Sequence, residues 1–184
     1  MQIVAFGYQA GVGKNTCGEI LQKSIPYSIL DSIAHKLKDV CHDLYGWAGL
    51  HHGDYYEMHR EEKSIVLPKI GLSPREIWVK FGTLVAREVY HSTWIDYLIK
   101  NYENKHVNTL ILTDLRFLDE FEILKERGTF CVLVKSPERV EDNEIIRIAE
   151  NPEMENMPWD YTIRNDGSIG DLRNKISDLL KVIN

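Results

Sequence analysis

The chain has 184 residues, of which 43% are hydrophobic and 27% are charged, and this size and composition predict one folded domain with a substantial core. Its formal net charge of −6 argues against broad binding to nucleic-acid backbones, so we expect no nucleic-acid partner. No apolar run approaches the ~20 residues of a membrane span, and the N-terminus is unlike a signal peptide, so we expect a cytoplasmic protein with no membrane partner.

The first apolar run leads directly into a glycine-rich turn. Residues 2–6 (QIVAF) contain no breaker and predict a strand, and residues 7–16 (GYQAGVGKNT) follow at once, with a helical pattern from about Lys14. Strand, glycine turn, lysine, hydroxyl residue and helix, in this order, are typical of a loop that binds phosphates. The spacing departs from the commonest form, because Gly7 lies six residues before Gly13 and Asn15 follows the lysine.

Each part of this turn has a predicted task in binding the phosphates of ATP. The glycines let backbone N–H groups converge on phosphate oxygens, and the positive N-terminal end of the helix points at the same anion. Lys14 supplies a charge to the β- and γ-phosphates, and Thr16 supplies a hydroxyl to a magnesium ion. The predicted ATP-binding residues are Gly11, Val12, Gly13, Lys14, Asn15 and Thr16. The alternative is a glycine-rich turn that binds nothing.

The rest of the chain alternates between strand and helix patterns. Four further short strands are expected at 27–30, 109–113, 129–134 and 161–164. After the helix at 15–23, we expect helices at 33–44 (with Ser32 as its cap), 74–81, 83–90, 94–102, 119–127 and 171–182. This order predicts parallel βαβ units joined by right-handed crossovers, and therefore an α/β fold with ligands at the carboxyl ends of the strands.

Two polar residues follow the apolar strand at 109–113. Asp114 is a candidate to support a magnesium ion, as acids at this place do in phosphate-loop proteins, and a plain turn cap is the alternative. Arg116 is a candidate to hold a phosphoryl oxygen, and a surface ion pair with Asp119 or Glu120 is the alternative.

Arg87 lies in a helical pattern beside the apolar residues Leu84 and Val85, which predicts that the arginine is on the buried side. A buried arginine needs an anion to offset the cost of its desolvation. The phosphate of an acceptor nucleotide would supply that anion. The alternative is a structural ion pair with Glu88 or with another acid.

Five stretches, in chain order, resemble the deoxynucleoside monophosphate kinases of bacteriophages. They are 11–16 (GVGKNT), 31–38 (DSIAHKLK), 81–87 (FGTLVAR) with Trp94 after it, 113–120 (TDLRFLDE) and 163–168 (IRNDGS). The resemblance implies a three-layer P-loop kinase fold, in which helices cover a mostly parallel central sheet of about five strands. It also implies a single domain over 1–184, with a helical acceptor-binding insertion at 32–105.

The same resemblance implies an activity. The protein would transfer the γ-phosphoryl group of ATP to a deoxynucleoside monophosphate, with magnesium, to give a diphosphate for DNA synthesis. By position, Lys14, Arg87 and Arg116 would be catalytic, and Thr16 and Asp114 would hold the metal. The acceptor-binding residues would be Lys36, Lys38, Arg75, Arg87, Trp94 and Arg116. If the chain is viral it would act in the host cytoplasm, with a two-fold dimer as the default assembly.

Three further features have more than one interpretation. The acidic stretch 138–157, with Arg139 and Arg147, is a candidate lid that expels water, or else a solvated loop. Tyr55 and Tyr56 could stack on a base or belong to the core. The three cysteines have neither zinc nor disulfide spacing, so we expect packed thiols. Two other functions could use the same loop, namely an NTP hydrolase and a non-catalytic nucleotide-binding module.

Overall fold

The computed structural model describes residues 1–137 and 151–183. The chain divides into two compact units, one made of Met1–Ser32 with Lys100–Asn184 and the other of Ile33–Ile99. The first unit contains the whole β-sheet, and the second is helical. In the described ranges, no helix combines the length and the apolar character that crossing a membrane requires.

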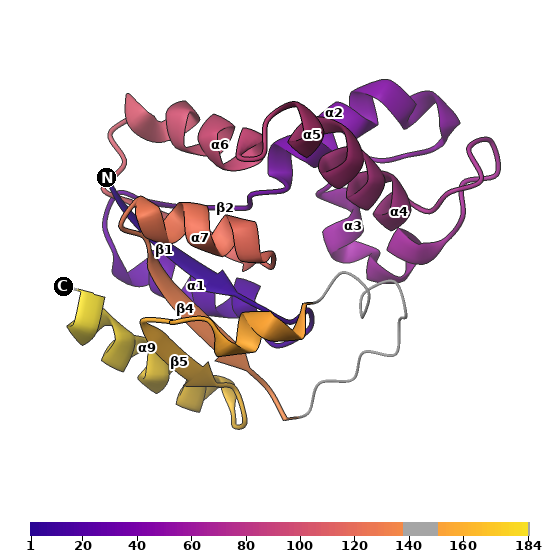
Figure 1. Ribbon diagram of the computed structural model, residues 1–184. Helices are drawn as coiled ribbons and strands as arrows, with labels where there is room; N and C mark the ends of the chain where they lie inside the picture. The colour runs from indigo at the N-terminus through magenta and orange to yellow at the C-terminus, as the bar shows by residue number, and fades with distance from the viewer. Residues whose placement is uncertain (138–150, 184) are drawn as a thin grey trace. The chain divides into compact units, whose positions relative to one another are not determined.

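The sheet has five strands, and every neighbouring pair is parallel (Figure 1). The strands are β1 (Gln2–Gly7), β2 (Ser28–Asp31), β3 (Thr109–Leu115), β4 (Phe130–Lys135) and β5 (Tyr161–Arg164). Their order across the sheet is β2-β3-β1-β4-β5. The predicted α/β fold with a parallel sheet of about five strands is therefore confirmed.

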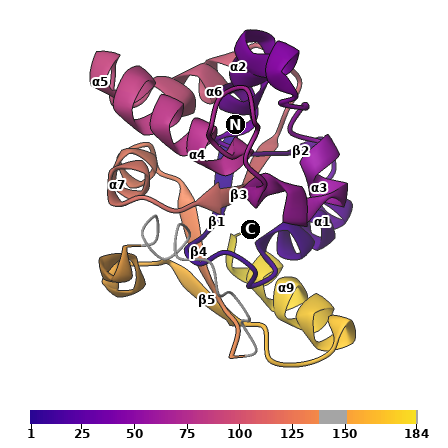
Figure 2. The ribbon, with the colours of Figure 1, turned by 90° about the vertical axis from the view of Figure 1, so that its right-hand side faces the viewer.

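Helices cover both faces of this sheet. Figure 2 shows α7 (Leu118–Glu126) on one side, and α1 (Lys14–Ser24) and α9 (Ile169–Ile183) on the other. The core against α1 and α9 contains the buried residues Val4, Phe6, Val12, Cys17, Leu21, Ile111, Val132, Val134, Ile163, Leu172, Ile176 and Leu179. Because both faces are buried, the inner strands are continuous apolar runs, and this is why they could be found in the sequence.

The helical unit is built from short segments. They are α2 (His35–Tyr45), η1 (Gly46–Ala48), α3 (Tyr55–Met58), η2 (Arg60–Ser64), α4 (Pro74–Val79), η3 (Lys80–Ala86) and α5 (Arg87–Val89), and α6 (Thr93–Glu103) begins in this unit. Gly82 packs tightly on Leu37, since a Cβ at Gly82 would lie 2.7 Å from Leu37 Cδ2. The Tyr56 ring meets the Trp78 ring edge-on at 5.3 Å, and both residues are buried, so this aromatic pair belongs to the unit's own core.

The predicted cap of α2 is wrong. The helix begins at His35, its N-cap residue is Ala34, and no side chain caps it. Ser32 has a different role, because its N–H donates to Asp31 Oδ1 at 2.7 Å as the chain leaves β2. The helix therefore starts two residues later than predicted.

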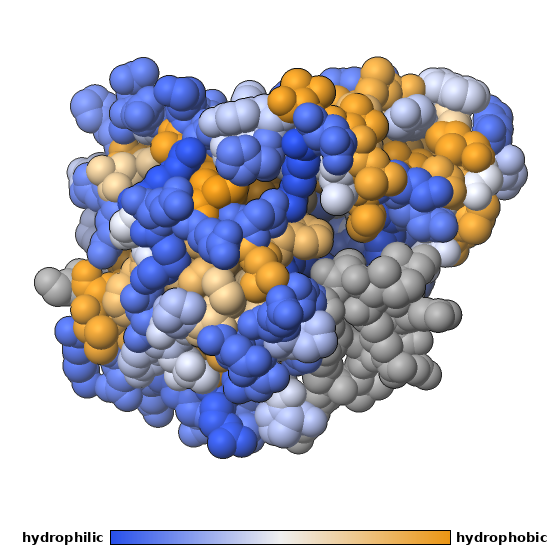
Figure 3. Space-filling view, in the orientation of Figure 1, coloured by the Kyte–Doolittle hydropathy of each residue, from blue (hydrophilic) through white to orange (hydrophobic). Residues whose placement is uncertain are grey.

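The two helices predicted at 74–81 and 83–90 form one continuous run with a π-helical middle, Lys80–Ala86. A π-turn uses i→i+5 bonds, so it rotates the following side chains away from the positions that a period of 3.6 assigns to them. Leu84 is 65% exposed and Val85 50% exposed, so the inference that Arg87 shares a buried apolar side is wrong. Hydrophobic surface gathers over the α4–α5 region in Figure 3.

The chain before β5 is anchored to the sheet unit. Met154, in η4 (Pro152–Asn156), is fully buried, and its carbonyl accepts a hydrogen bond of 2.8 Å from Trp159 Nε1. Lys135 and Glu155 form an ion pair of 2.6 Å. Most of the stretch predicted as a lid, with Arg139 and Arg147, lies outside the described residues.

Candidate phosphate-binding site

The loop between β1 and α1 is built from left-handed residues. Tyr8, Gly11 and Gly13 have φ angles of 84°, 76° and 95°. Only glycine adopts this conformation at little cost, so Tyr8 is strained there. The Tyr8 N–H donates to the carbonyl of Leu115 at 2.8 Å, and its side chain is buried, so the surroundings hold the residue in place. Tyr8 thus has a backbone conformation that usually requires glycine.

The N-terminal end of α1 carries no internal cap. Gly13 is the N-cap, it makes no side-chain cap bond, and the first turn contains no acidic residue. The first N–H groups of a helix lack partners within the helix, and they form the positive end of its dipole. An anion placed at the loop would be bound by these groups.

Lys14 is almost entirely buried at this helix end, with 5% of its surface exposed. Its ammonium donates to the carbonyl of Tyr8 at 3.2 Å and also to the carbonyl of Gln9. The ammonium is therefore held over the loop by two neutral acceptors. A phosphate oxygen is a stronger partner than a carbonyl, because a hydrogen bond between ions is about twice as strong as a neutral one.

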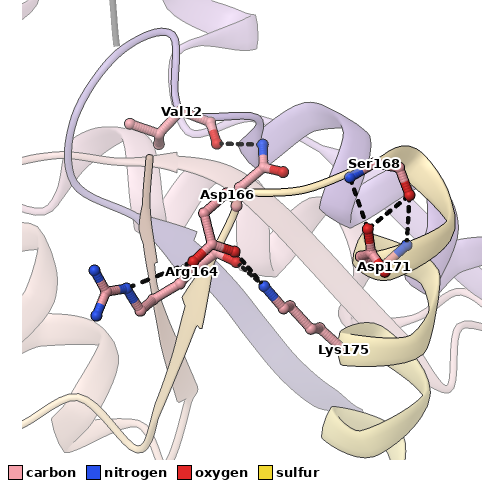
Figure 4. Close-up of polar contacts among 7 residues, drawn as sticks. Val12, Arg164, Asp166, Ser168, Asp171 and Lys175 are labelled. Carbon is pink, nitrogen blue, oxygen red and sulfur yellow. Dashed lines mark hydrogen bonds and ion pairs between the residues drawn. The ribbon is translucent and has the colours of Figure 1, made fainter. Parts of the chain in front are cut away.

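A side chain from the far end of the chain also holds the loop. Asn165, directly after β5, donates through Nδ2 to the carbonyl of Val12 at 3.1 Å; Figure 4 labels Val12 at the accepting end of this bond. Sequence reasoning did not select Asn165 as a site residue. The only signal near it is the IRNDGS stretch, whose likeness to the phage kinases covers the last strand and turn.

Packing, rather than phosphate binding, requires a glycine at position 7. A Cβ at Gly7 would lie 2.5 Å from the Trp159 ring and 2.8 Å from the carbonyl oxygen of Leu115. Trp159 also meets the ring of Phe121 at 4.8 Å. Trp159 is a second residue that the sequence did not indicate, and it sets the course of the chain into the loop.

Asp114 lies beside the start of the loop, because Gly7 of β1 is paired with Leu115 of β3. Asp114 is half-buried at the carboxyl end of its strand. The acid and the loop therefore lie at the same edge of the sheet, where parallel α/β sheets bind ligands.

Arg116 follows one residue beyond β3. Its backbone N–H, and that of Phe117, donate to Glu120 Oε2 at 3.1 and 3.3 Å. Glu120 therefore binds the backbone at the start of α7. Within the described part of the chain, the guanidinium of Arg116 makes no ion pair with Asp119 or Glu120.

The donor set around the loop suits magnesium better than zinc. Among residues 1–137 and 151–183, no three His, Cys, Asp or Glu side chains are grouped so that they could hold a metal ion by themselves. Magnesium is usually bound by one or two protein oxygens together with water and phosphate. The Thr16 hydroxyl and the Asp114 carboxylate are of this kind, so these residues fit a magnesium–nucleotide complex.

The cysteine beside the loop is not a nucleophile. Burial raises the pKa of Cys17 to about 12, although Lys14 opposes the shift. Burial also raises the pKa values of Cys41 and Cys131 to about 12. The three thiols therefore stay protonated near neutral pH, which agrees with the expectation of packed side chains.

The predicted acceptor-binding lysines lie in the helical unit. Lys36 Nζ lies 5.8 Å from the centre of the Tyr97 ring, and Lys38 Nζ lies 5.4 Å from that of Trp78. Lys38 is also 3.6 Å from Glu57 Oε1. Burial alone would raise the pKa of Glu57, but Lys38 and a second lysine, Lys63, hold it below its usual value.

The other predicted acceptor residues lie on the α4–α5 run and on α6. Arg75 is half-buried in the first turn of α4, and Arg87 is half-buried at the first residue of α5. Trp94 is buried, and its Nε1 donates to the carbonyl of Gly82 at 3.4 Å. Arg87 belongs to the helical unit and Arg116 to the sheet unit.

No family model matches the chain, and no curated protein matches it. Solved structures do share its fold. TT1252 from Thermus thermophilus is 16% identical over 100% of this chain and 98% of its own, with a TM-score of 0.56. Shikimate kinase from Aquifex aeolicus is 16% identical over 98% of this chain and 96% of its own, with a TM-score of 0.54. Shikimate kinase from Acinetobacter baumannii, in complex with shikimate, is 15% identical over 100% and 93%, with a TM-score of 0.52.

These likenesses define the class of architecture. The chain has the P-loop kinase fold, a parallel five-stranded sheet between helices with the phosphate-type loop after its first strand. At 15–16% identity they are likenesses of fold alone.

Proposed function

We propose that this protein is a deoxynucleoside monophosphate kinase that transfers the γ-phosphoryl group of ATP to a deoxynucleoside monophosphate, giving ADP and the diphosphate. The observation that carries this proposal is the loop after β1, with its left-handed backbone, the uncapped end of α1 and the buried ammonium of Lys14. These groups are suited to a chain of phosphates.

The reaction requires positioning more than acid–base chemistry. The N–H groups of Gly11–Thr16 and the Lys14 ammonium would bind the β- and γ-phosphates of the donor. Thr16 and Asp114 would hold magnesium, which neutralises phosphate charge when bound. The nucleophile is an oxygen of the acceptor's own phosphate, which is ionised near neutral pH, so no strong base is needed.

The acceptor requires cations of its own. For this role we assign Lys36, Lys38, Arg75, Arg87 and Arg116, and we assign the uncharged Trp94 to the same acceptor-binding set, all on the strength of their resemblance to the phage kinases. Half-burial of the Arg87 side chain supports the assignment, because a desolvated guanidinium gains more from a dianion than an exposed one does. Arg139 and Arg147 complete the proposal as cations of a lid over 138–157.

The test is a panel of deoxynucleoside monophosphates with ATP and magnesium, with the products separated by chromatography. We expect ADP to form rapidly only when a suitable monophosphate is present, together with an equal amount of its diphosphate. Shikimate belongs in the panel, because proteins of the same fold carry its name. ADP release that is the same with and without every acceptor would favour a hydrolase, and nucleotide binding without turnover would favour a binding module.

We expect Arg87→Ala to raise the KM for the monophosphate about tenfold to hundredfold, which corresponds to the loss of a charged hydrogen bond. The KM for ATP is expected to change little, since the proposed role is on the acceptor side. Steady-state kinetics with each substrate varied in turn measure both values. Lys80→Ala is the matched control, because Lys80 is an exposed cation on the same helical run. An unchanged acceptor KM in Arg87→Ala would remove this residue from the site.

A further inference from the structure

Asn165 connects the end of the sheet to the phosphate-binding loop. Its backbone N–H donates to the carbonyl of Lys135 at 2.7 Å, which fixes the residue at the end of β4 and β5. Its side chain extends to the loop, where Nδ2 donates to the carbonyl of Val12 at 3.1 Å. The two bonded residues are 153 positions apart, so this is a tertiary contact that closes the site.

The side-chain amide of Asn165 also fills the space beside Gly13, the residue after Val12. A Cβ at Gly13 would lie 2.5 Å from Asn165 Nδ2. The Val12 side chain is itself fully buried in the core between the sheet and α9. The peptide between Val12 and Gly13 is therefore held from both sides, directly before Lys14.

This contact fixes the direction of a phosphate-binding donor. The described chain has no cis peptide bonds. In a planar trans peptide the C=O and N–H groups point in opposite directions. Since Asn165 binds the carbonyl of Val12, the N–H of Gly13 points away from Asn165.

The turn that carries Asn165 is braced by helix α9. Lys175 pairs with Asp166 at 2.6 Å and also donates to the carbonyl of Arg164, so one ammonium holds the residues on both sides of Asn165 (Figure 4). Ser168 and Asp171 bond each other at the start of the same helix without bonding the loop. The amide is thus presented to Val12 by a turn that is already ordered.

We propose that Asn165 is a positioning residue for the donor nucleotide, which holds the N–H of Gly13 in the direction that phosphate binding requires. The inference rests on the proposed function, because it takes the loop to be the site of the donor's phosphates. Without the amide the Val12–Gly13 peptide loses one of its two restraints, and binding has to order it more fully. The loss is therefore in donor affinity, not in affinity for the acceptor.

The test measures ADP binding by calorimetry for the wild type, Asn165→Ala and Asn165→Asp. Loss of one neutral hydrogen bond predicts that Asn165→Ala binds ADP about threefold to tenfold more weakly. Asn165→Asp keeps the shape but has no donor and adds a negative charge, so its binding is expected to be weaker still. In kinetics, the KM for ATP is expected to rise while the KM for the monophosphate stays near that of the wild type.

Ser168→Ala is the matched control, because it removes a cap in the same turn without touching the loop. We expect it to bind ADP as the wild type does, even if it unfolds at a lower temperature. Wild-type affinity in Asn165→Ala, or in a folded Asn165→Asp if the alanine variant does not fold, overturns the inference and leaves the proposed function standing. A loss of ADP affinity in Ser168→Ala that equals the loss in Asn165→Ala also overturns the inference. Wild-type protein that binds no ADP overturns the proposed function itself, and the inference with it.

Discussion

Replacing Lys14 with alanine is expected to lower turnover of ATP and a monophosphate at least ~100-fold, while the protein stays folded. Removing one group that stabilises charge in a transition state commonly costs about 100-fold to 1,000-fold in rate. Lys14 is the cation at the N-terminal end of α1, and it is already buried against the loop. Its ammonium donates to the carbonyls of Tyr8 and Gln9, and the loss of hydrogen bonds of this kind costs about 0.5–1.5 kcal/mol each, which a folded domain can bear.

The measurement is the initial rate of ADP formation with saturating ATP, beside a thermal unfolding curve of each variant. Lys23→Ala is the control, because Lys23 is exposed in the last turn of the same helix. We expect Lys23→Ala to react at the wild-type rate. A folded Lys14→Ala protein with near-normal turnover would show that the loop does not hold the reacting phosphates.

The sheet was predictable because burial leaves a simple pattern in the sequence. A strand of a parallel sheet is covered on both faces, so β1, β3 and β4 are apolar runs that end at polar residues or glycines. The helices between the strands could be predicted because their apolar residues recur with a period of about 3.6 residues. Alternation of the two patterns predicted parallel strands joined by crossovers, whereas the strand order β2-β3-β1-β4-β5 was not predicted.

The helical unit was harder to predict, because its local structure does not keep one period. The π-turn at Lys80–Ala86 moves Leu84 and Val85 to the surface, where a regular helix would have buried them beside Arg87. The start of α2 depends on a bond between the Asp31 carboxylate and the next N–H, which competes with a serine cap. Both errors arise where local hydrogen bonds override the repeating pattern.

The candidate site was predictable where it is local in sequence and not where it is tertiary. The spacing of Gly11, Gly13, Lys14 and Thr16 already indicates the loop. Asn165 bonds the loop and Trp159 packs on Gly7 directly before it, both from near the other end of the chain, and the glycine–lysine spacing of the loop indicates neither residue. The left-handed Tyr8 shows, in addition, that the surrounding structure can impose on another residue a conformation that glycine adopts at little cost.

The helix that carries Lys14 can approach the sheet only because residue 18 has no side chain. A Cβ at Gly18 would lie 2.5 Å from Thr113 Cγ2 and 2.6 Å from Leu30 Cδ1. The Leu30 methyl can move, but Thr113 is buried in β3 and its branched side chain has few rotamers. Gly18→Val is therefore expected to lower the free energy of unfolding by about 1–3 kcal/mol, the usual cost of overpacking.

The same substitution is expected to raise the KM for ATP, because a displaced α1 takes Lys14 and Thr16 away from the end of the sheet. Chemical denaturation measures the stability, and steady-state kinetics measure the KM. Gly170→Ala is the matched control, since it also adds a Cβ to a helical glycine, but its nearest neighbour there is Ser168 Oγ at 3.4 Å. We expect that variant to be as stable as the wild type or slightly more so, because alanine favours a helix. If Gly18→Val had the same stability and the same KM for ATP as Gly170→Ala, the close contact between α1 and the sheet would not be the cause of the position of Lys14.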